Sequence, residues 1–421
     1  MKKKDCRINI IGAGISGLTA AKVLEEKGYY PVIIESSNNV GGRVKTEIIE
    51  GYQLDVGFQV LLTEYPAAKK HLNYTDLKLQ KLLPGALIYK NRVEKKIGNP
   101  ISNLSFVIPT LFSSIGTLFD KIKICKLHLK LRFKSLEDIF KSHEKNTYNY
   151  LQELGFSEEI INDFFRPFFS GIFLETELET SSRMFEFVFK MFGQGHVAIP
   201  KLGMQAIPKQ MAKNLTKTTF KFNSKVSAVT ENEIILNDQT KIQSDYTIIT
   251  ADLDNLINNF KTPKQKWKSC VNLYFETEKR NISDPLIGLI SKKNTVVNNL
   301  FYPSSISQKY KGVKELLSVT VIDSQKYSNT SLVEQVKKEL KDICNINVGR
   351  LIKQYVITKA LPDLKELQYK GECSEQQLSK SVFLAGDTLL NGSLNAAFIS
   401  GEMAAIKLAS IDSLNELKQK K

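Results

Sequence analysis

Three glycines near the start of the chain have a spacing that suits a bound phosphate group. Gly12, Gly14 and Gly17 form the pattern GxGxxG, in which the first glycine permits a tight turn, the second lets backbone approach a pyrophosphate, and the third lets a helix pack against a strand. Ala13 and Ser16 belong to the same turn, and the helix beginning near Ser16 directs its N–H groups toward the phosphates. The pattern therefore predicts the pyrophosphate site of a dinucleotide.

An acidic residue follows at the distance that such a site requires. Glu35 lies 18 residues after Gly17, directly before Ser36, where a carboxylate can accept hydrogen bonds from the hydroxyls of the adenosine ribose. A ribose 2′-phosphate would meet a like charge at this position. The acid therefore disfavours NADP and leaves FAD or NAD.

Three short segments predict the elements that position these residues. Residues 7–11 form a β-rich run, residues 18–28 have helical spacing and end on Gly28, and residues 31–35 predict a second strand. A glycine at the end of a helix suits a C-cap. The order of strand, glycine turn, helix and strand is that of a dinucleotide-binding βαβ unit.

A second glycine-rich element follows the acid, and here the sequence resembles a known family. Residues 41–46 read GGRVKT, which resembles the GGRxxT/S element of flavin-containing amine oxidases, phytoene-type desaturases and protoporphyrinogen oxidases. The resemblance implies that Gly42 and Arg43 lie along the pyrophosphate and the flavin. Glycine lets the chain pass close to a cofactor, and arginine offers a fork of donors to phosphate oxygens. The implied cofactor is FAD, and the implied class is an FAD-dependent oxidoreductase.

Further patches of this resemblance follow in the family's order. Residues 51–59 resemble the strand that runs to the flavin, which implies that Gly57 and Phe58 approach the ring. Residues 200–205 resemble the turn that re-enters the cofactor domain, and Val226 matches the position whose backbone contacts adenine. These patches extend the resemblance well beyond the first glycine turn.

The last patch lies near the C-terminus. Gly386 and Asp387 resemble the family's GD element, which holds the ribityl-phosphate region. Ser393 and Leu394 lead into a predicted helix at 395–409, whose N-terminus would face the flavin. The cofactor domain is therefore expected to use both ends of the chain.

The catalytic position of the amine-oxidising branch is altered here. A flavin performs the hydride or electron transfer itself, so catalytic side chains can be few. Members that oxidise amines commonly carry a lysine near the flavin, on a strand that matches residues 268–275. The best match is Cys270, with Lys268 two positions earlier and expected on the same face. This departure favours desaturase-like chemistry, and no catalytic residue is assigned.

We predict an α/β fold in which a Rossmann-like FAD-binding domain is discontinuous and an α+β substrate domain is interleaved with it. The FAD-binding domain is expected to comprise residues 1–70, 205–265 and 375–421, and the substrate-binding domain residues 71–204 and 266–374. Strands within 218–250 are expected to be outer strands of the nucleotide-binding domain. Further strands are expected at 270–276, 286–291, 296–302 and 316–322, followed by a helix at 331–344.

Residues 75–204 are predicted to be mostly helical and are rich in phenylalanine. Fifteen of the 23 phenylalanines lie between Phe106 and Phe192. A large aromatic surface beside a flavin suits a long or polycyclic apolar substrate, whereas ordinary core packing accounts for most of these side chains.

Composition narrows the class of protein. The formal charge of +15 comes from lysines that are spread along the 421 residues. This spread favours an ordinary solvated surface as the explanation of the charge. Binding to an anionic membrane is left open, and binding to nucleic acid is disfavoured. The five cysteines and four histidines are scattered, so we expect neither a disulfide framework nor a metal site. No signal peptide is expected. The predicted location is the cytoplasm, and attachment to the periphery of a membrane is left open.

A long uncharged stretch at 97–119 precedes a basic stretch at 120–134. Pro100, Pro109 and Gly116 interrupt the first part, so a transmembrane helix is not expected. As a helix, residues 120–134 would show two apolar faces separated by lysines. A buried two-faced helix and peripheral membrane contact are both open, and no oligomeric state is predicted.

The expected activity is the FAD-dependent dehydrogenation of a largely apolar small molecule, such as a carotenoid-like polyene or a porphyrinogen. FAD is expected to be noncovalent, because no cysteine lies close to the matched flavin contacts at 386–394. One alternative is an amine oxidase that acts on a primary amine or a polyamine. Another is a binding module for prenylated proteins, of the GDP dissociation inhibitor type, although such a module need not retain GxGxxG, Glu35 and GGRxxT.

Overall fold

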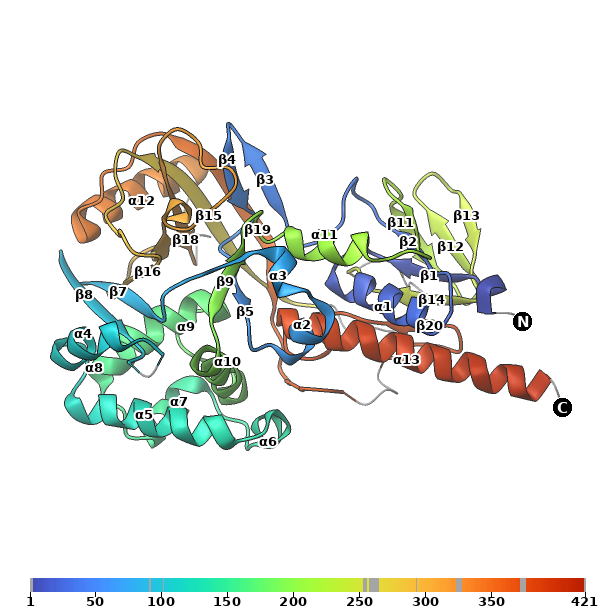
Figure 1. Cartoon of the computed structure of the whole chain (residues 1–421), viewed down its shortest axis with the longest axis horizontal. Coiled ribbons are helices and arrows are strands. Elements are labelled where there is room, and N and C mark those ends of the chain that lie inside the picture. Colours follow the sequence, from blue (N-terminus) through green and yellow to red (C-terminus); the bar gives the residue numbers. More distant parts are fainter. Residues whose placement is uncertain are drawn as a thin grey trace.

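Two main sheets lie toward opposite ends of an elongated molecule (Figure 1). The computed structural model describes residues 3–419 except 91, 101, 253–255, 257–264, 293, 323–327 and 372–375. A parallel sheet lies near both chain termini, and a larger mixed sheet lies toward the other end. The predicted α/β class is confirmed.

The parallel sheet takes its strands from three separated parts of the chain. Its order is β10 (Thr219–Lys221), β2 (Val32–Ile34), β1 (Ile8–Ile11), β14 (Tyr246–Ile249) and β20 (Val382–Leu384). Every neighbouring pair is parallel. The helix α1 (Ile15–Glu26) joins β1 to β2, as the βαβ pattern predicts.

The strands expected within 218–250 are present, but their predicted place as outer strands is only partly right. β10 lies at an edge, whereas β14 lies inside the sheet between β1 and β20. β14 is buried along its whole length, as suits a central parallel strand. A separate antiparallel sheet consists of β11 (Val226–Val229), β12 (Glu233–Leu236) and β13 (Lys241–Gln243).

The last helix, α13 (Leu394–Gln419), packs along α1 (Figure 1). Gly401 makes this close approach possible, because a Cβ there would lie 2.2 Å from the carbonyl oxygen of Ser16. Tyr29 Oη donates a hydrogen bond to Asp412 Oδ2 at 2.8 Å. Within the described ranges, α13 is the one helix long and apolar enough to cross a membrane, but 61% of that stretch is buried. Its apolar composition is therefore explained by packing inside the protein.

The larger sheet has seven strands. Their order is β19 (Leu351–Pro362), β15 (Trp267–Thr277), β18 (Glu315–Val321), β17 (Val297–Phe301), β16 (Ile287–Ile290), β7 (Gly85–Lys90) and β8 (Val93–Gly98). Leu332, Val336 and Leu340 of α12 (Asn329–Cys344) are buried against one face. The four strands and the helix expected between 270 and 344 are confirmed.

The hairpin of β7 and β8 lies within residues 75–204, a region that the sequence predicts to be mostly helical. β7 pairs in parallel with β16, which begins at Ile287. Ala86 and Ile88 are buried, and Arg92 forms the tight turn with a φ of 67°. Local periodicity did not reveal this hairpin because its buried face depends on a strand far away in the sequence.

Apart from the short strands β6 (Leu79–Lys81) and β9 (Val197–Pro200), the regular structure in the rest of the region is helical, as expected. Its helices are α4 (Val107–Phe112), α5 (Leu118–Phe133), α6 (Leu136–Lys141), α7 (Thr147–Glu153), α8 (Glu158–Ile160), α9 (Arg166–Phe173) and α10 (Ser182–Gln194). Among them, α9 packs against β16 and β17 of the large sheet.

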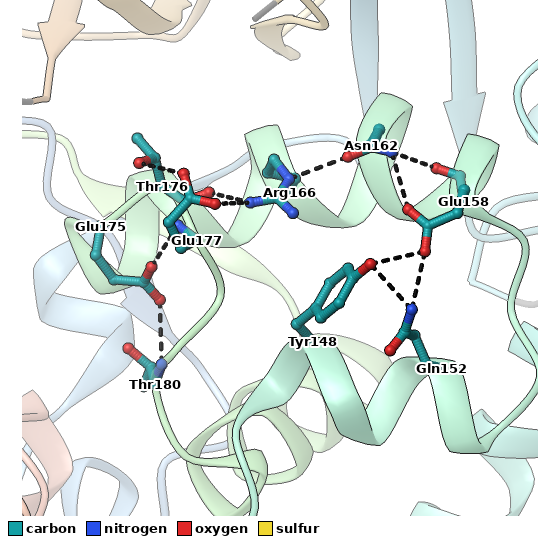
Figure 2. Close-up of polar contacts among 9 residues, drawn as sticks. All are labelled: Tyr148, Gln152, Glu158, Asn162, Arg166, Glu175, Thr176, Glu177 and Thr180. Carbon is teal, nitrogen blue, oxygen red and sulfur yellow. Dashed lines mark hydrogen bonds and ion pairs between the residues drawn. The ribbon is translucent and has the colours of Figure 1, made fainter.

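A polar network fixes α9 to its neighbours (Figure 2). Glu158 accepts hydrogen bonds from Tyr148 Oη at 2.8 Å, Gln152 Nε2 at 3.1 Å and Asn162 Nδ2 at 3.2 Å. Arg166 then donates to Asn162 Oδ1 at 3.1 Å. This chain of contacts holds the outer side of α9 while its apolar side faces the interior.

Short elements connect the two main sheets. β3 (Thr46–Ile49) and β4 (Tyr52–Asp55) form a hairpin, and β5 (Leu61–Leu62), β9 (Val197–Pro200) and β6 (Leu79–Lys81) form a small sheet. The helices are α2 (Pro66–His71), α3 (Tyr74–Leu77) and α11 (Ala206–Lys213).

Candidate active site

A large cavity extends from the edge of the parallel sheet to the phenylalanine-rich helices. Its volume is about 1720 Å³, larger than the roughly 300–1,000 Å³ typical of a site for one small molecule. The lining runs from the turn after β1, past β15 and β17, to α9 and α10. The cavity therefore has room for a cofactor and a second molecule.

Most of the predicted site residues line this cavity, although they come from distant parts of the chain. They are Gly12, Gly14, Ser16, Glu35, Ser36, Gly42, Arg43, Gly57, Phe58, Gly386, Asp387, Ser393 and Leu394. The parallel sheet brings several of them together because the carboxyl ends of β1, β2 and β20 lie at the same edge.

Three predicted residues do not belong to the lining. The Ala13 N–H donates to Glu35 Oε2 at 2.7 Å and so orients that side chain. A Cβ on Gly17 would lie 2.1 Å from the Gly12 carbonyl oxygen, which agrees with the predicted close packing of helix and strand. Val226 is buried in a cluster with Ile34, so its side chain does not reach the cavity.

The N-terminus of α1 forms one end of the cavity. No side chain caps this helix, whose first N–H groups follow Gly14, and a Cβ on Gly14 would have no neighbour within 4 Å. The Gly41 N–H donates to the Ala13 carbonyl at 2.9 Å, which ties the second glycine element to the first. Free N–H groups at a helix N-terminus, beside open space, fit a phosphate group.

Glu35 is rigidly held at the same end. Besides the Ala13 N–H, it accepts hydrogen bonds at Oε1 from the Ser37 N–H and the Ser37 hydroxyl, both at 2.8 Å, and from Ser36 Oγ at 3.2 Å. The side chain lines the cavity although only 8% of the residue is exposed. A fixed carboxylate at this point fits the hydroxyls of a ribose.

An ion pair joins the two ends of the chain beside the cavity. Arg43 Nη2 donates to Asp387 Oδ1, 344 residues later in the sequence. The guanidinium also lies over the indole ring of Trp267, 5.2 Å from its centre. A cation held in this way can contact a phosphate while remaining partly neutralised by the carboxylate.

Trp267 and Lys359 are lining residues that the sequence interpretation missed. Lys359 Nζ forms an ion pair with Asp252 and lies 5.9 Å from the centre of the Trp267 ring. All three residues line the cavity near Arg43. The available signal was that Trp267 is the chain's single tryptophan, next to the strand matched to the family's catalytic lysine.

The expected pairing of Lys268 with Cys270 on one face is wrong. Cys270 lines the cavity, whereas Lys268 does not, and Lys268 Nζ lies 3.4 Å from Thr180 Oγ1 and 3.9 Å from Asp363 Oδ1. A register irregularity between the two residues, where β15 pairs with β19, breaks the alternation of the strand. No lysine of β15 therefore reaches the cavity.

The cavity also contains cysteine side chains. Cys270 and Cys125 line it, and burial raises the pKa of the Cys270 thiol to about 11, so this thiol stays protonated at neutral pH. Cys373 lies outside the described residues. Within the described part of the chain, no group of three or more His, Cys, Asp or Glu side chains is placed to hold a metal ion.

Two polar side chains face the cavity from the large sheet, and the sequence interpretation missed both. Asn299 of β17 and Thr320 of β18 are register partners, are 3% and 4% exposed, and line the cavity. Asn299 Oδ1 and Thr320 Oγ1 have no hydrogen-bond partner among the described residues. Buried polar atoms usually have a partner, so these atoms are available to a polar group of a bound molecule.

Asp55 links the strand toward Gly57 to the turn at 200–205. Its Oδ1 accepts hydrogen bonds from Thr46 Oγ1 at 2.5 Å and from the Met204 N–H at 2.9 Å. The Gln205 N–H in turn donates to Thr46 Oγ1 at 3.0 Å. Burial is the main cause that raises the pKa of Asp55 to about 6.

The phenylalanines divide between the core and the cavity. Phe165, Phe173, Phe185 and Phe187 are fully buried and do not line the cavity. Within residues 75–204, the phenylalanines that line it are Phe164, Phe168, Phe169, Phe189 and Phe192. Core packing therefore accounts for part of this aromatic cluster, and the rest forms an aromatic wall of the cavity.

The sequence model of one family, described as flavin containing amine oxidoreductase, matches residues 15–408. The chain belongs to this family. As a flavin-containing amine oxidoreductase, it is a flavin-dependent oxidoreductase enzyme. Membership favours the enzyme over the expected alternative of a non-enzymatic binding module.

Two relatives of this flavin-containing amine oxidoreductase match shorter stretches. Protoporphyrinogen oxidase 2, chloroplastic/mitochondrial, of Arabidopsis thaliana is 25% identical over 165 residues, which cover 39% of this chain and 32% of that protein. The L-amino-acid oxidase of Crotalus adamanteus is 37% identical over 73 residues, which cover 17% of this chain and 14% of the relative. The matched stretch thus spans at most about a third of either relative.

Solved structures show the same fold over nearly the whole of this amine oxidoreductase chain. An oxidoreductase from Methanosarcina mazei has a TM-score of 0.72 at 15% identity, over 97% of this chain and 100% of that one. Putrescine oxidase bound to putrescine has a TM-score of 0.68 at 14% identity, over 97% and 99% of the two chains. At such identities the likeness defines the fold and leaves the substrate open.

Proposed function

We propose that the protein binds FAD noncovalently and dehydrogenates a large, mainly apolar molecule. The observation that carries this proposal is the composition of the cavity beyond the nucleotide end. Among the described lining residues, the carboxylates are Glu35, Asp252 and Asp387. All three lie near the parallel sheet, and two of them are paired with cations.

FAD fits the nucleotide end of the cavity. The uncapped N-terminus of α1 and Arg43 would hold its pyrophosphate, and Glu35 would hold its adenosine ribose. Gly57, Phe58 and the segment from Gly386 to Leu394 would border its flavin. The segment 386–394 contains no cysteine, which supports noncovalent attachment. Bound flavin supplies the chemistry, because it accepts a hydride or electrons from the substrate.

The remaining part of the cavity suits an apolar substrate better than a cationic one. A protonated amine buried there would need a carboxylate to compensate its charge. Phe164, Phe168, Phe189 and Phe192 line this part instead. Asn299 and Thr320 offer neutral polar contacts, which fit a substrate with one polar group on an apolar body.

Anaerobic reduction of the bound flavin tests the substrate class. The purified protein is mixed with a porphyrinogen, a polyene, putrescine or an L-amino acid, and the visible absorbance of the flavin is followed. We expect bleaching with an apolar compound and none with putrescine. Rapid bleaching by putrescine or an L-amino acid, with none by apolar compounds, would establish the amine oxidase alternative.

Two variants connect the result to the cavity. Phe192→Ala removes a lining side chain and is expected to raise KM for the apolar substrate without releasing the flavin. Phe222→Ala is the matched control, because Phe222 is partly buried but outside the cavity lining. Acid precipitation of the wild type should release the yellow cofactor into solution, and a pellet that stays yellow would contradict noncovalent attachment.

A further inference from the structure

Exposed apolar side chains are concentrated on α4, α5 and the turn before them. Ten of the 18 large hydrophobic side chains that are exposed in the described chain lie between residues 104 and 133. They are Leu104, Val107, Ile108, Leu111, Phe112, Leu118, Phe119, Ile122, Leu129 and Phe133, which we call the α4–α5 face. Phe112, Phe119 and Phe133 are 80%, 75% and 85% exposed. An apolar patch of this kind marks an interaction surface.

The sequence of α5 places these side chains on one stripe of the helix. Leu118, Ile122, Leu129 and Phe133 recur at helical spacing and are exposed. On the opposite side, Leu127 and Leu131 are buried in the core. The two apolar faces expected from the sequence are therefore both present, and one of them is uncovered.

Cations border this stripe, and carboxylates do not neutralise them. Lys126, Lys130 and Arg132 are exposed, and none of the three forms an ion pair with a carboxylate within the described residues. Lys121 Nζ instead donates to the carbonyl oxygens of Leu111 and Ser113 at 3.0 and 2.7 Å. The one acid of α5, Asp120, is buried and caps its own helix. The surroundings of the α4–α5 face are thus positively charged.

The cavity reaches the surface at this face. Val107, Leu111, Leu118 and Ile122 are exposed and also line the cavity. Figure 1 places α4 and α5 at the end of the molecule away from both labelled termini. An apolar path therefore leads from the α4–α5 face toward the phenylalanine-lined part of the cavity.

We propose that the α4–α5 face docks on the surface of an anionic lipid bilayer, through which apolar substrate enters the cavity. The apolar stripe enters the boundary between headgroups and acyl chains, and the bordering lysines and arginine contact anionic headgroups. Charge complementarity selects this occupant over a neutral apolar partner. Substrate entry rests on the proposed function, whereas docking does not.

Sedimentation with vesicles tests docking in the absence of any substrate. The full-length, flavin-loaded protein is mixed with vesicles of phosphatidylcholine, with or without phosphatidylglycerol. We expect binding that is stronger with phosphatidylglycerol and is reduced by salt. Absence of binding to the anionic vesicles would overturn the proposal.

Substitutions locate the docking surface. Phe112→Asp combined with Phe119→Asp is expected to weaken binding by roughly tenfold for each side chain, because each loses its burial in the bilayer. Neither residue lines the cavity, so activity on detergent-dissolved substrate should persist. Val313→Asp is the matched control, because Val313 is 95% exposed and lies outside the α4–α5 face. Equal binding by the double variant and the wild type would refute the assignment.

Two further outcomes separate the alternatives. If the wild type is a dimer that ignores vesicles, and the double variant is a monomer, a second copy of the chain covers the face and the proposal is wrong. If vesicles bind as expected but apolar compounds never bleach the flavin, docking stands and the proposed function fails. Unchanged flavin absorbance and circular dichroism establish that each variant is folded.

Discussion

Replacing Asp55 with asparagine should make the protein more stable at neutral and alkaline pH. Both donors to this side chain, the Thr46 hydroxyl and the Met204 N–H, bond to Oδ1. An asparagine carbonyl oxygen can accept both bonds, and its amide group takes the place of Oδ2. The substitution therefore removes a buried charge while it keeps the junction between β4 and the turn at 200–205.

The magnitude follows from the raised pKa of Asp55. Burial moves this pKa from 3.8 to about 6, so between these pH values the folded protein holds a proton that the unfolded chain has lost. The free energy of unfolding therefore falls as pH rises through this window. From low to high pH, the raised pKa of Asp55 lowers the free energy of unfolding by about 3 kcal/mol in total. About 1.4 kcal/mol of this decrease occurs between about pH 5 and pH 8.

Urea unfolding at several pH values between about 5 and 8 measures this effect. Asp55→Asn should exceed the wild type by about 3 kcal/mol near pH 8, and the difference should shrink by about 1.4 kcal/mol toward pH 5. Asp342→Asn, at an exposed position of α12, is the matched control and should follow the wild type. A variant that is less stable than the wild type at pH 8, or a difference independent of pH, would refute the reasoning.

Four further substitutions test the site and the core. Gly17→Ala should disrupt the β1–α1 junction and yield protein without flavin, because the new Cβ would lie 2.1 Å from the Gly12 carbonyl oxygen. Gly14→Ala should fold and bind FAD more weakly, because the new Cβ would have no neighbour within 4 Å. The ratio of flavin to protein absorbance distinguishes the two variants. Glu35→Gln should weaken FAD binding about tenfold or more through loss of charged hydrogen bonds, measured by fluorescence titration, and unchanged affinity would contradict the assigned ribose contact. Phe165→Ala, at a fully buried position outside the cavity lining, should lower the free energy of unfolding by about 3–5 kcal/mol in urea, and a loss below about 1 kcal/mol would contradict its place in the core.

Sequence patterns that act locally predicted many of the residues that line the cavity beside the N-terminus of α1. The glycines of GxGxxG are required by close contacts within one turn, such as that between Gly17 and the Gly12 carbonyl oxygen. Glu35 lies at the end of β2 because the strand and helix lengths of a βαβ unit are restricted. Apolar runs such as 382–384 also identified buried strands directly.

Features that depend on distant partners were not predictable in the same way. Asn299 and Thr320 meet only because β17 and β18 pair in one register, and neither residue has a local signature. Lys268 lies outside the cavity because the pairing of β15 with β19 has a register irregularity, which the alternation of residue types in the sequence does not reveal. The β7–β8 hairpin likewise depends on β16 for its place in the sheet.

The ion pair between Arg43 and Asp387 has a consequence for biosynthesis. The two residues are 344 positions apart, so a ribosome adding about 5–20 residues per second separates them by roughly 20 to 70 s. During that interval the emerging βαβ unit lacks β20 and α13, and the apolar side of α1 has no covering helix. Insertion of the cofactor is therefore expected to follow release of the finished chain, and the nascent N-terminal segment is the part that most needs protection by chaperones.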